Sequence, residues 1–207
     1  MKATLLSAAM MISGIAIAAD INLPVPNKTG GKPLMTALAE RKSDRKFSDK
    51  AIPLQTLSDL LWAANGINRP DGRRTAPSAM NRQEIDLYAL LPNGAFRYDA
   101  ASHKLVEVTT EDLRKSSGLS GFSGTAPLTI ISVVNRKKQE MGASPAAARL
   151  GAVDCGFIGQ NIYLFCASEG LNTVYLATLN AQALAKSLKL ADGDEALFAQ
   201  TVGYPAP

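Results

Sequence analysis

Histidine and cysteine are scarce in this chain of 207 residues, which contains one histidine, His103, and two cysteines, Cys155 and Cys166. Neither a C-x-x-C pair nor an H-E-x-x-H motif is present, so a zinc or haem site has almost no ligands to draw on. The two cysteines fall in one expected helix, roughly 16 Å apart along its axis, which is far beyond the reach of a disulfide. We therefore expect no metal centre and no intrachain disulfide.

The chain also lacks a strong charge of either sign, with a formal net charge of +4 and a pI near 9.1. This balance suits an anionic small molecule or cofactor, and it falls short of the dense basic face of a nucleic-acid binder. Aromatic residues are few, and only Phe47 lies among clustered cations, so stacking platforms for single strands are missing. We expect no nucleic-acid partner.

The amino terminus lacks charge over a long run. Residues 1–18 begin with Lys2, continue without charge and end in Ala16-Ile17-Ala18. A positive start, an apolar stretch and small residues at the cleavage positions are typical of a secretory signal peptide. The run is too short and too rich in small residues for a stable membrane span. We expect residues 1–18 to be cleaved and the mature chain to be exported, to the periplasm or out of the cell.

The rest of the chain divides into an arm and one domain. Residues 19–32 carry several Pro and Gly, which favour an extended arm lying on the surface or on a partner chain. Residues 33–207 are long enough for one sizeable core. Helices are expected over 33–41, 53–65, 110–115, 144–170 and 180–190. Strands are expected over 84–91, 95–99, 105–108, 125–134, 172–179 and 197–204. The early hairpin indicates an α+β or mixed α/β sandwich.

Four cations lie within six residues in RKSDRKFS, from Arg41 to Ser48. Arg41, Ser43 and Arg45 occupy every second position, so an extended backbone would point all three to one side. Two guanidinium forks and a hydroxyl would suit a phosphate, with Lys42 and Lys46 adding looser charge. Taken alone, the charge run is equally typical of a solvated helix end.

A second polar segment, RRTAPSAMN, ends at Asn81. Pro77 stiffens it, and Ser78 and Asn81 offer short hydrogen-bonding side chains with no bulky apolar residue before Met80. Such a surface suits a flat polar heterocycle, although an ordinary surface loop has the same composition.

Five motifs, in order and spacing, resemble the FMN-dependent nitroreductase family: RKSDRKF, LSDLLWAANGI, RTAPSAMN, GQNIYLFCASEGLNTVYL and TVGYP. The resemblance covers about residues 33 to 204. The hairpin PNGAFRYDAASHKLVEV followed by EDLR resembles the branch of SagB-type dehydrogenases and thiazoline oxidases. Each motif is weak alone, whereas five in order make a strong signal.

The resemblance implies an α+β fold with a nitroreductase-like three-layer sandwich, its mainly antiparallel central sheet flanked by helices. It also implies an intertwined homodimer with helix 144–170 in the interface, and FMN as cofactor. It assigns the FMN phosphate and ribityl chain to Arg41, Lys42, Ser43 and Arg45. It assigns the isoalloxazine ring to a loop from the other subunit, comprising Pro77, Ser78, Ala79 and Asn81, and to the turn at Ala177 and Thr178.

The implied activity is two-electron hydride transfer through flavin N5 to nitroaromatic or quinone-type acceptors, with NAD(P)H as hydride donor. No side chain stands out as a catalytic acid or base; we expect His103 to be an exposed turn residue and Trp62 a core anchor. Two other functions stay open. A SagB-type dehydrogenase oxidising a heterocycle or other small substrate would fit an exported enzyme. A non-catalytic flavin-binding protein would fit the lack of a cation after Lys189, where relatives often have one.

Overall fold

A seven-stranded antiparallel sheet forms the centre of the computed structural model, which describes residues 19–115 and 121–207. The expected signal peptide, residues 1–18, lies outside the described residues. The strands are β1 (Ile21–Asn22), β2 (Ile85–Leu91), β3 (Gly94–Asp99), β4 (Lys104–Thr109), β5 (Leu128–Val134), β6 (Asn172–Leu176) and β7 (Glu195–Gly203). Their order in the sheet is β1-β4-β3-β2-β5-β7-β6, and every neighbouring pair is antiparallel.

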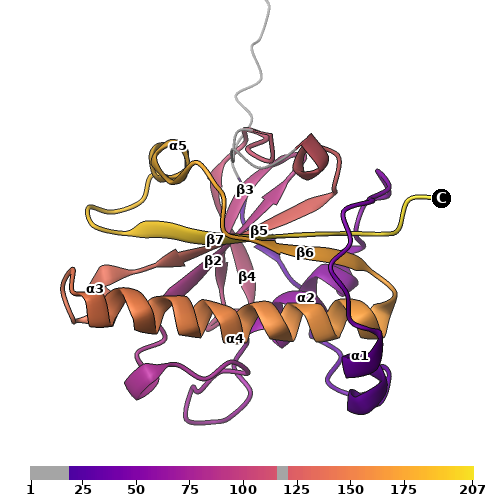
Figure 1. The fold of residues 1–207 in the computed structure, drawn as a ribbon, viewed down its shortest axis with the longest axis horizontal. Coiled ribbons are helices and arrows are strands. Elements are labelled where there is room, and N and C mark those ends of the chain that lie inside the picture. Colours follow the sequence, from indigo (N-terminus) through magenta and orange to yellow (C-terminus); the bar gives the residue numbers. More distant parts are fainter. Residues whose placement is uncertain (1–18, 116–120) are drawn as a thin grey trace, which may run out of the picture.

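Helices cover both faces of this sheet (Figure 1). The helices are α1 (Leu34–Glu40), α2 (Leu54–Asn65), α3 (Arg136–Gln139), α4 (Pro145–Glu169) and α5 (Ala181–Ser187), with 3-10 turns at Ala79–Asn81 and Gly121–Gly124. On β5, Ile130 packs in the core shared with α2 and α4, whereas Ile131 packs in the core shared with α5. Burial on both faces explains why β5 is a continuous apolar run. The expected three-layer α+β sandwich is confirmed.

The longest helix, α4, begins and ends where its sequence predicts. Ser144 caps it by accepting a hydrogen bond from the Ala147 N–H, Pro145 occupies its first position, and Gly170 ends it with a φ of 69°. Cys155 and Cys166 are both buried in it as free thiols, as expected. The helix has the length and composition of a membrane span, yet its buried side chains belong to the core beneath the sheet.

His103 joins the amino-terminal arm to the domain, which corrects its expected exposure. Its imidazole is half-buried, with Nε2 2.7 Å from Ser58 Oγ and Nδ1 2.9 Å from Tyr98 Oη. Ser58 spends its own proton on the Pro24 carbonyl, so His103 Nε2 carries the donated hydrogen and Nδ1 accepts from Tyr98. Burial lowers the pKa of His103, which favours this neutral form.

Two other expectations were wrong. Residues 110–115 form bends and turns instead of a helix, because the Asp112 carboxylate binds the backbone N–H and guanidinium of Arg114. Local side-chain contacts of this kind compete with helical hydrogen bonds. Trp62 is half-exposed instead of anchoring the core, and it lines a hollow of about 560 Å³ between the arm, α2 and α4.

Candidate functional site

The cationic stretch, residues 41–46, runs as extended chain along the edge of the sheet. Helix α1 ends at Glu40, and Arg41 already has an extended ψ of 134°. The Asp44 N–H donates to the Thr173 carbonyl of β6 over 2.9 Å, and the Asn172 side chain donates to the Lys46 carbonyl over 2.8 Å. Because the cations follow the helix and are pinned to a strand, the alternative of a solvated helix end does not apply.

The side chains of this stretch alternate as an extended backbone requires. Arg41 lies over the Tyr163 ring, its guanidinium carbon 5.1 Å from the ring centre, and Ser43 Oγ is 2.6 Å from Tyr163 Oη. Lys42 instead pairs with Asp44 over 3.3 Å. Within residues 19–115 and 121–207, the exposed guanidinium groups of Arg41 and Arg45 form no ion pair. Their charge is therefore available to an external anion.

Tyr163 connects this stretch to β6, a role that sequence reasoning missed by treating the residue as core. Its hydroxyl oxygen accepts the Tyr175 N–H over 3.0 Å, so its own proton can go to Ser43 Oγ. The Ser43 hydroxyl hydrogen is then free for another acceptor. The available signal was that a tyrosine in an apolar helix needs a partner for its hydroxyl.

Replacing Tyr163 with phenylalanine should destabilise the fold, because the Tyr175 N–H loses its acceptor. A part-buried donor left without a partner costs about 1–3 kcal/mol. For a chain of this size the Tm should fall by roughly 2 to 10 °C in thermal unfolding followed by circular dichroism. Tyr204→Phe is the matched control, since no described residue hydrogen-bonds to the Tyr204 hydroxyl. Equal Tm values for both variants would contradict the connecting role of Tyr163.

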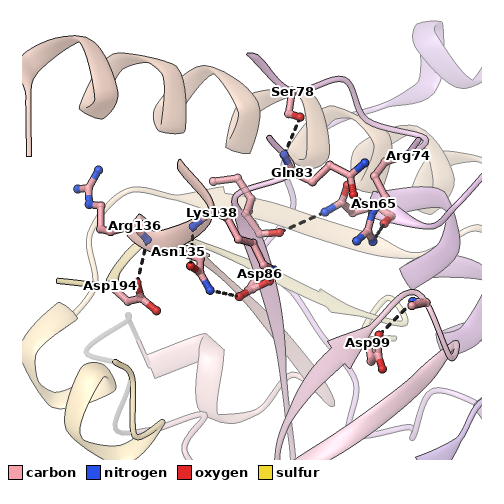
Figure 2. A network of polar contacts seen from close by, with 12 residues as sticks. Asn65, Arg74, Ser78, Gln83, Asp86, Asp99, Asn135, Arg136, Lys138 and Asp194 are labelled. Carbon is pink, nitrogen blue, oxygen red and sulfur yellow. Dashed lines mark hydrogen bonds and ion pairs between the residues drawn. The ribbon is translucent and has the colours of Figure 1, made fainter. Parts of the chain in front are cut away.

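The second predicted segment, residues 77–83, is braced from within. Ser78 Oγ accepts the Gln83 N–H over 2.9 Å, and the Gln83 side chain donates to Asn81 Oδ1 over 3.2 Å. Arg74 donates to Gln83 Oε1 over 2.8 Å and to the Asn65 carbonyl over 2.9 Å, which ties the segment to the end of α2. Figure 2 shows Ser78, Gln83, Arg74 and Asn65 gathered in this network.

The backbone of the same segment is strained. Met80, Asn81 and Gln83 all have φ between 52° and 55°, in the left-handed region that non-glycine residues rarely adopt. Such residues persist only where surrounding contacts hold them, and here the Ala79 N–H donates to Asp154 Oδ2 of α4 over 3.0 Å. Pro77, Met80 and Asn81 remain exposed. The segment is therefore a preorganised surface and differs from an ordinary loop.

Within one chain, the two predicted halves of the site do not meet. The loop of residues 77–83 contacts α4 at Asp154, whereas the cationic stretch contacts it at Tyr163. Nine residues of helix separate these contacts by about 13.5 Å along the axis and by half a turn around it. The two segments consequently lie on opposite sides of α4 (Figure 1).

Ala177 and Thr178, by contrast, lie on the same side as the cationic stretch. Both are exposed and directly follow β6, whose Thr173 carbonyl binds the Asp44 N–H. The four residues from Thr173 to Ala177 span roughly 13 Å of strand. One chain thus offers an anion-binding end and, further along β6, an exposed backbone turn, which fits an elongated cofactor with a phosphate and a flat ring.

An apolar surface lies exposed between these segments. Val153 and Phe157 on α4 are 51% and 44% exposed, and Met80 in the strained segment is 80% exposed. Leu34 and Met35 on α1, the helix next to α4, are exposed as well. Exposed apolar side chains gathered in this way mark an interaction surface. The expectation that α4 is buried all round does not hold for the single chain.

Comparisons with known proteins agree with these features. The model of the nitroreductase family matches residues 38–204. A protein of Methanocaldococcus jannaschii is 25% identical over 167 residues, which are 76% of this chain and 84% of that protein. A crystal structure from Ralstonia eutropha JMP134 is 40% identical, covers 91% of this chain and 90% of its own, and has a TM-score of 0.86. Both are named "putative nitroreductase".

A more distant structure shares the fold. The NADPH:FMN oxidoreductase of Vibrio harveyi, solved in complex with NAD+, is 18% identical with a TM-score of 0.64. The similarity covers 84% of this chain and 69% of the Vibrio chain.

Proposed function

This chain belongs to the nitroreductase family, and from that membership we propose that it binds FMN and passes hydride to nitroaromatic or quinone-type acceptors. Membership makes the chain an oxidoreductase of a flavin-dependent kind. The observation that carries the FMN proposal is the pair of guanidinium groups, Arg41 and Arg45, that flank Ser43 without an acidic partner among the described residues.

FMN, when bound, supplies two-electron hydride transfer at its N5 atom. Arg41 and Arg45 would hold the phosphate through their planar forks, and Ser43 would donate its free hydroxyl hydrogen. Lys42 is held by Asp44 and would contribute charge alone. The exposed turn at Ala177 and Thr178 would face the ring. These residues bind and orient, and none of them is assigned a proton transfer.

We propose further that the active form is a homodimer. Pro77, Ser78, Ala79 and Asn81 lie on the opposite side of α4 from the cationic stretch, so a second chain must bring its own copy of this loop to the ring. Val153 and Phe157 provide an apolar surface on α4 that such an association would bury. Each site would then combine the cationic stretch of one chain with the strained loop of the other.

The test of this function is an anaerobic absorption titration of the purified chain. We expect a yellow protein with FMN bands that bleach on addition of NADH or NADPH and return on addition of a quinone. The nicotinamide donor is suggested by the Vibrio harveyi enzyme, which is named for NADPH and was solved with NAD+. Absence of flavin from the protein, with no binding of added FMN, would contradict the proposal.

The signal-like sequence of residues 1–18 favours a second candidate, an exported enzyme that works in the oxidative direction. Nicotinamide pools lie in the cytoplasm, so a SagB-type dehydrogenase that takes hydride from a heterocycle or other small substrate would need no such donor. We expect the intact mass of the chain from a periplasmic fraction to correspond to a start at Ala19. An unprocessed mass, together with bleaching by NAD(P)H, would leave the reductive function alone.

A further inference from the structure

Two carboxyl groups lie buried against each other beneath the strained loop. Glu84, directly before β2, is 1% exposed, and Asp154 in the middle of α4 is 3% exposed. Their side chains are within hydrogen-bonding reach of each other. Neither oxygen of Glu84 receives a hydrogen bond from any residue in the described part of the chain.

The cations around this pair are engaged elsewhere. Arg82 donates to the Gln139 carbonyl and to Glu140, and Arg136 donates to the Gln139 side chain and to Glu195. Arg74, which lines the small cavity beside Asp154, donates to Gln83 and Asn65. Two ionised carboxylates would therefore be buried side by side without a cation, which is far too costly.

A single proton held between the two groups removes this cost. Asp154 Oδ2 accepts the Ala79 N–H, and this bond favours the ionised form of Asp154. Glu84 is then the protonated partner and donates its O–H to Asp154. Consistent with this, burial and, secondarily, the charge of Asp154 raise the pKa of Glu84. The neighbouring Cys155 does not compete for the role, because burial raises its pKa to about 12 and keeps it a thiol.

We propose that Glu84 and Asp154 form a proton-sharing pair that positions residues 77–83 against the cofactor ring, an inference that rests on the proposed function. Asp154 holds the start of the loop through the Ala79 N–H, and Glu84 directly follows its last residue, Gln83. The contact between the two carboxyl groups thus fastens both ends of the loop to α4. Both residues act through the loop and touch no reacting atom.

Ionisation of Glu84 would open this fastening. Two negative charges in contact repel each other, so the loop and the ring surface that it carries should shift when the proton leaves at higher pH. Glu84→Gln keeps a side-chain N–H that can donate to Asp154, and it cannot ionise. The variant should hold the loop closed at every pH.

The first experiment measures the flavin absorption spectrum and midpoint potential of the FMN-loaded protein from pH 5.5 to 9. Wild type should show a reversible spectral change and a break in the plot of potential against pH, and Glu84→Gln should lack both. Asp86→Asn is the matched control on β2, because Asp86 binds Asn135 and Lys138 (Figure 2) and does not contact the loop. Identical pH profiles for wild type and Glu84→Gln would overturn the positioning role.

The second experiment needs no cofactor and separates this inference from the proposed function. A group whose pKa is raised by folding makes stability fall as pH rises from its ordinary value toward the raised one. The Tm of Glu84→Gln minus that of wild type should therefore increase from pH 5 to pH 8. Infrared spectra should also show a protonated carboxyl band in wild type that the variant lacks.

The outcomes of the two experiments are distinguishable. A constant Tm difference together with no such carboxyl band would overturn the proton-sharing pair. A carboxyl band and a growing Tm difference in a protein that binds no FMN would overturn the proposed function and, with it, the role of the pair toward a ring.

Discussion

Replacing Arg41 and Arg45 together with alanine is expected to give a folded protein that purifies without flavin colour. Each guanidinium would make charge-assisted hydrogen bonds to the phosphate, worth about 1.5–3 kcal/mol per side chain. Losing both should weaken FMN binding by roughly 10²- to 10⁴-fold. Both side chains are exposed and form no ion pair within the described residues, so their removal should leave the Tm nearly unchanged. Fluorescence titration with FMN measures the affinity, and circular dichroism verifies the fold.

The matched control is Lys42→Ala, which removes a cation from the same stretch. Lys42 pairs with Asp44 and points away from Arg41 and Ser43, so its loss should lower FMN affinity less than 10-fold, the effect of roughly 1.4 kcal/mol. If Lys42→Ala proves as damaging as the double variant, net charge and not the arrangement of the arginines holds the phosphate. A double variant that keeps wild-type affinity would sink the phosphate assignment itself.

Replacing Phe157 with glutamate should separate the proposed dimer and abolish FMN binding in the same sample. An unpaired carboxylate buried in an apolar interface costs several kcal/mol, which corresponds to dimer affinity reduced by at least about 100-fold. FMN is lost as well because the ring loop of each site is expected to come from the other chain. Analytical ultracentrifugation gives the mass, and flavin absorbance in the same run gives the occupancy.

Leu54→Glu provides the control for this variant. Leu54 on α2 is also 44% exposed but lines a different, apolar hollow, together with Ile52 and Leu91. We expect this variant to remain a dimer with bound FMN. A Phe157→Glu monomer that binds FMN as tightly as wild type would show that one chain holds the whole site.

The fold was predictable because its signals are local. Ser144, Pro145 and Gly170 mark the ends of α4, and the apolar run of β5 identifies a strand covered on both faces. The wrong elements were those decided by side-chain contacts. Arg114 bound to Asp112 replaces the helix expected at residues 110–115, and β6 ends three residues before the strand expected there.

The candidate site was predictable only in its parts. Alternation in RKSDRKFS anticipated that Arg41 and Ser43 would share a side, because this follows from an extended backbone alone. The partners that hold each part come from distant segments: Tyr163 for the cationic stretch, and Asp154 with Glu84 for the loop. The one warning in the sequence was a lone acid, Asp154, within an apolar helix, since buried acids are rare without a partner.

The half-turn between Tyr163 and Asp154 on α4 has a genetic consequence. If each site takes its cationic stretch from one chain and its loop from the other, a chain with the arginines replaced and a chain with the loop replaced are both dead as homodimers. In a mixed dimer, the intact arginines of one chain face the intact loop of the other, while both defects fall into the second site. Two inactive alleles expressed together would complement each other, and the ceiling would be one working site in each mixed pair.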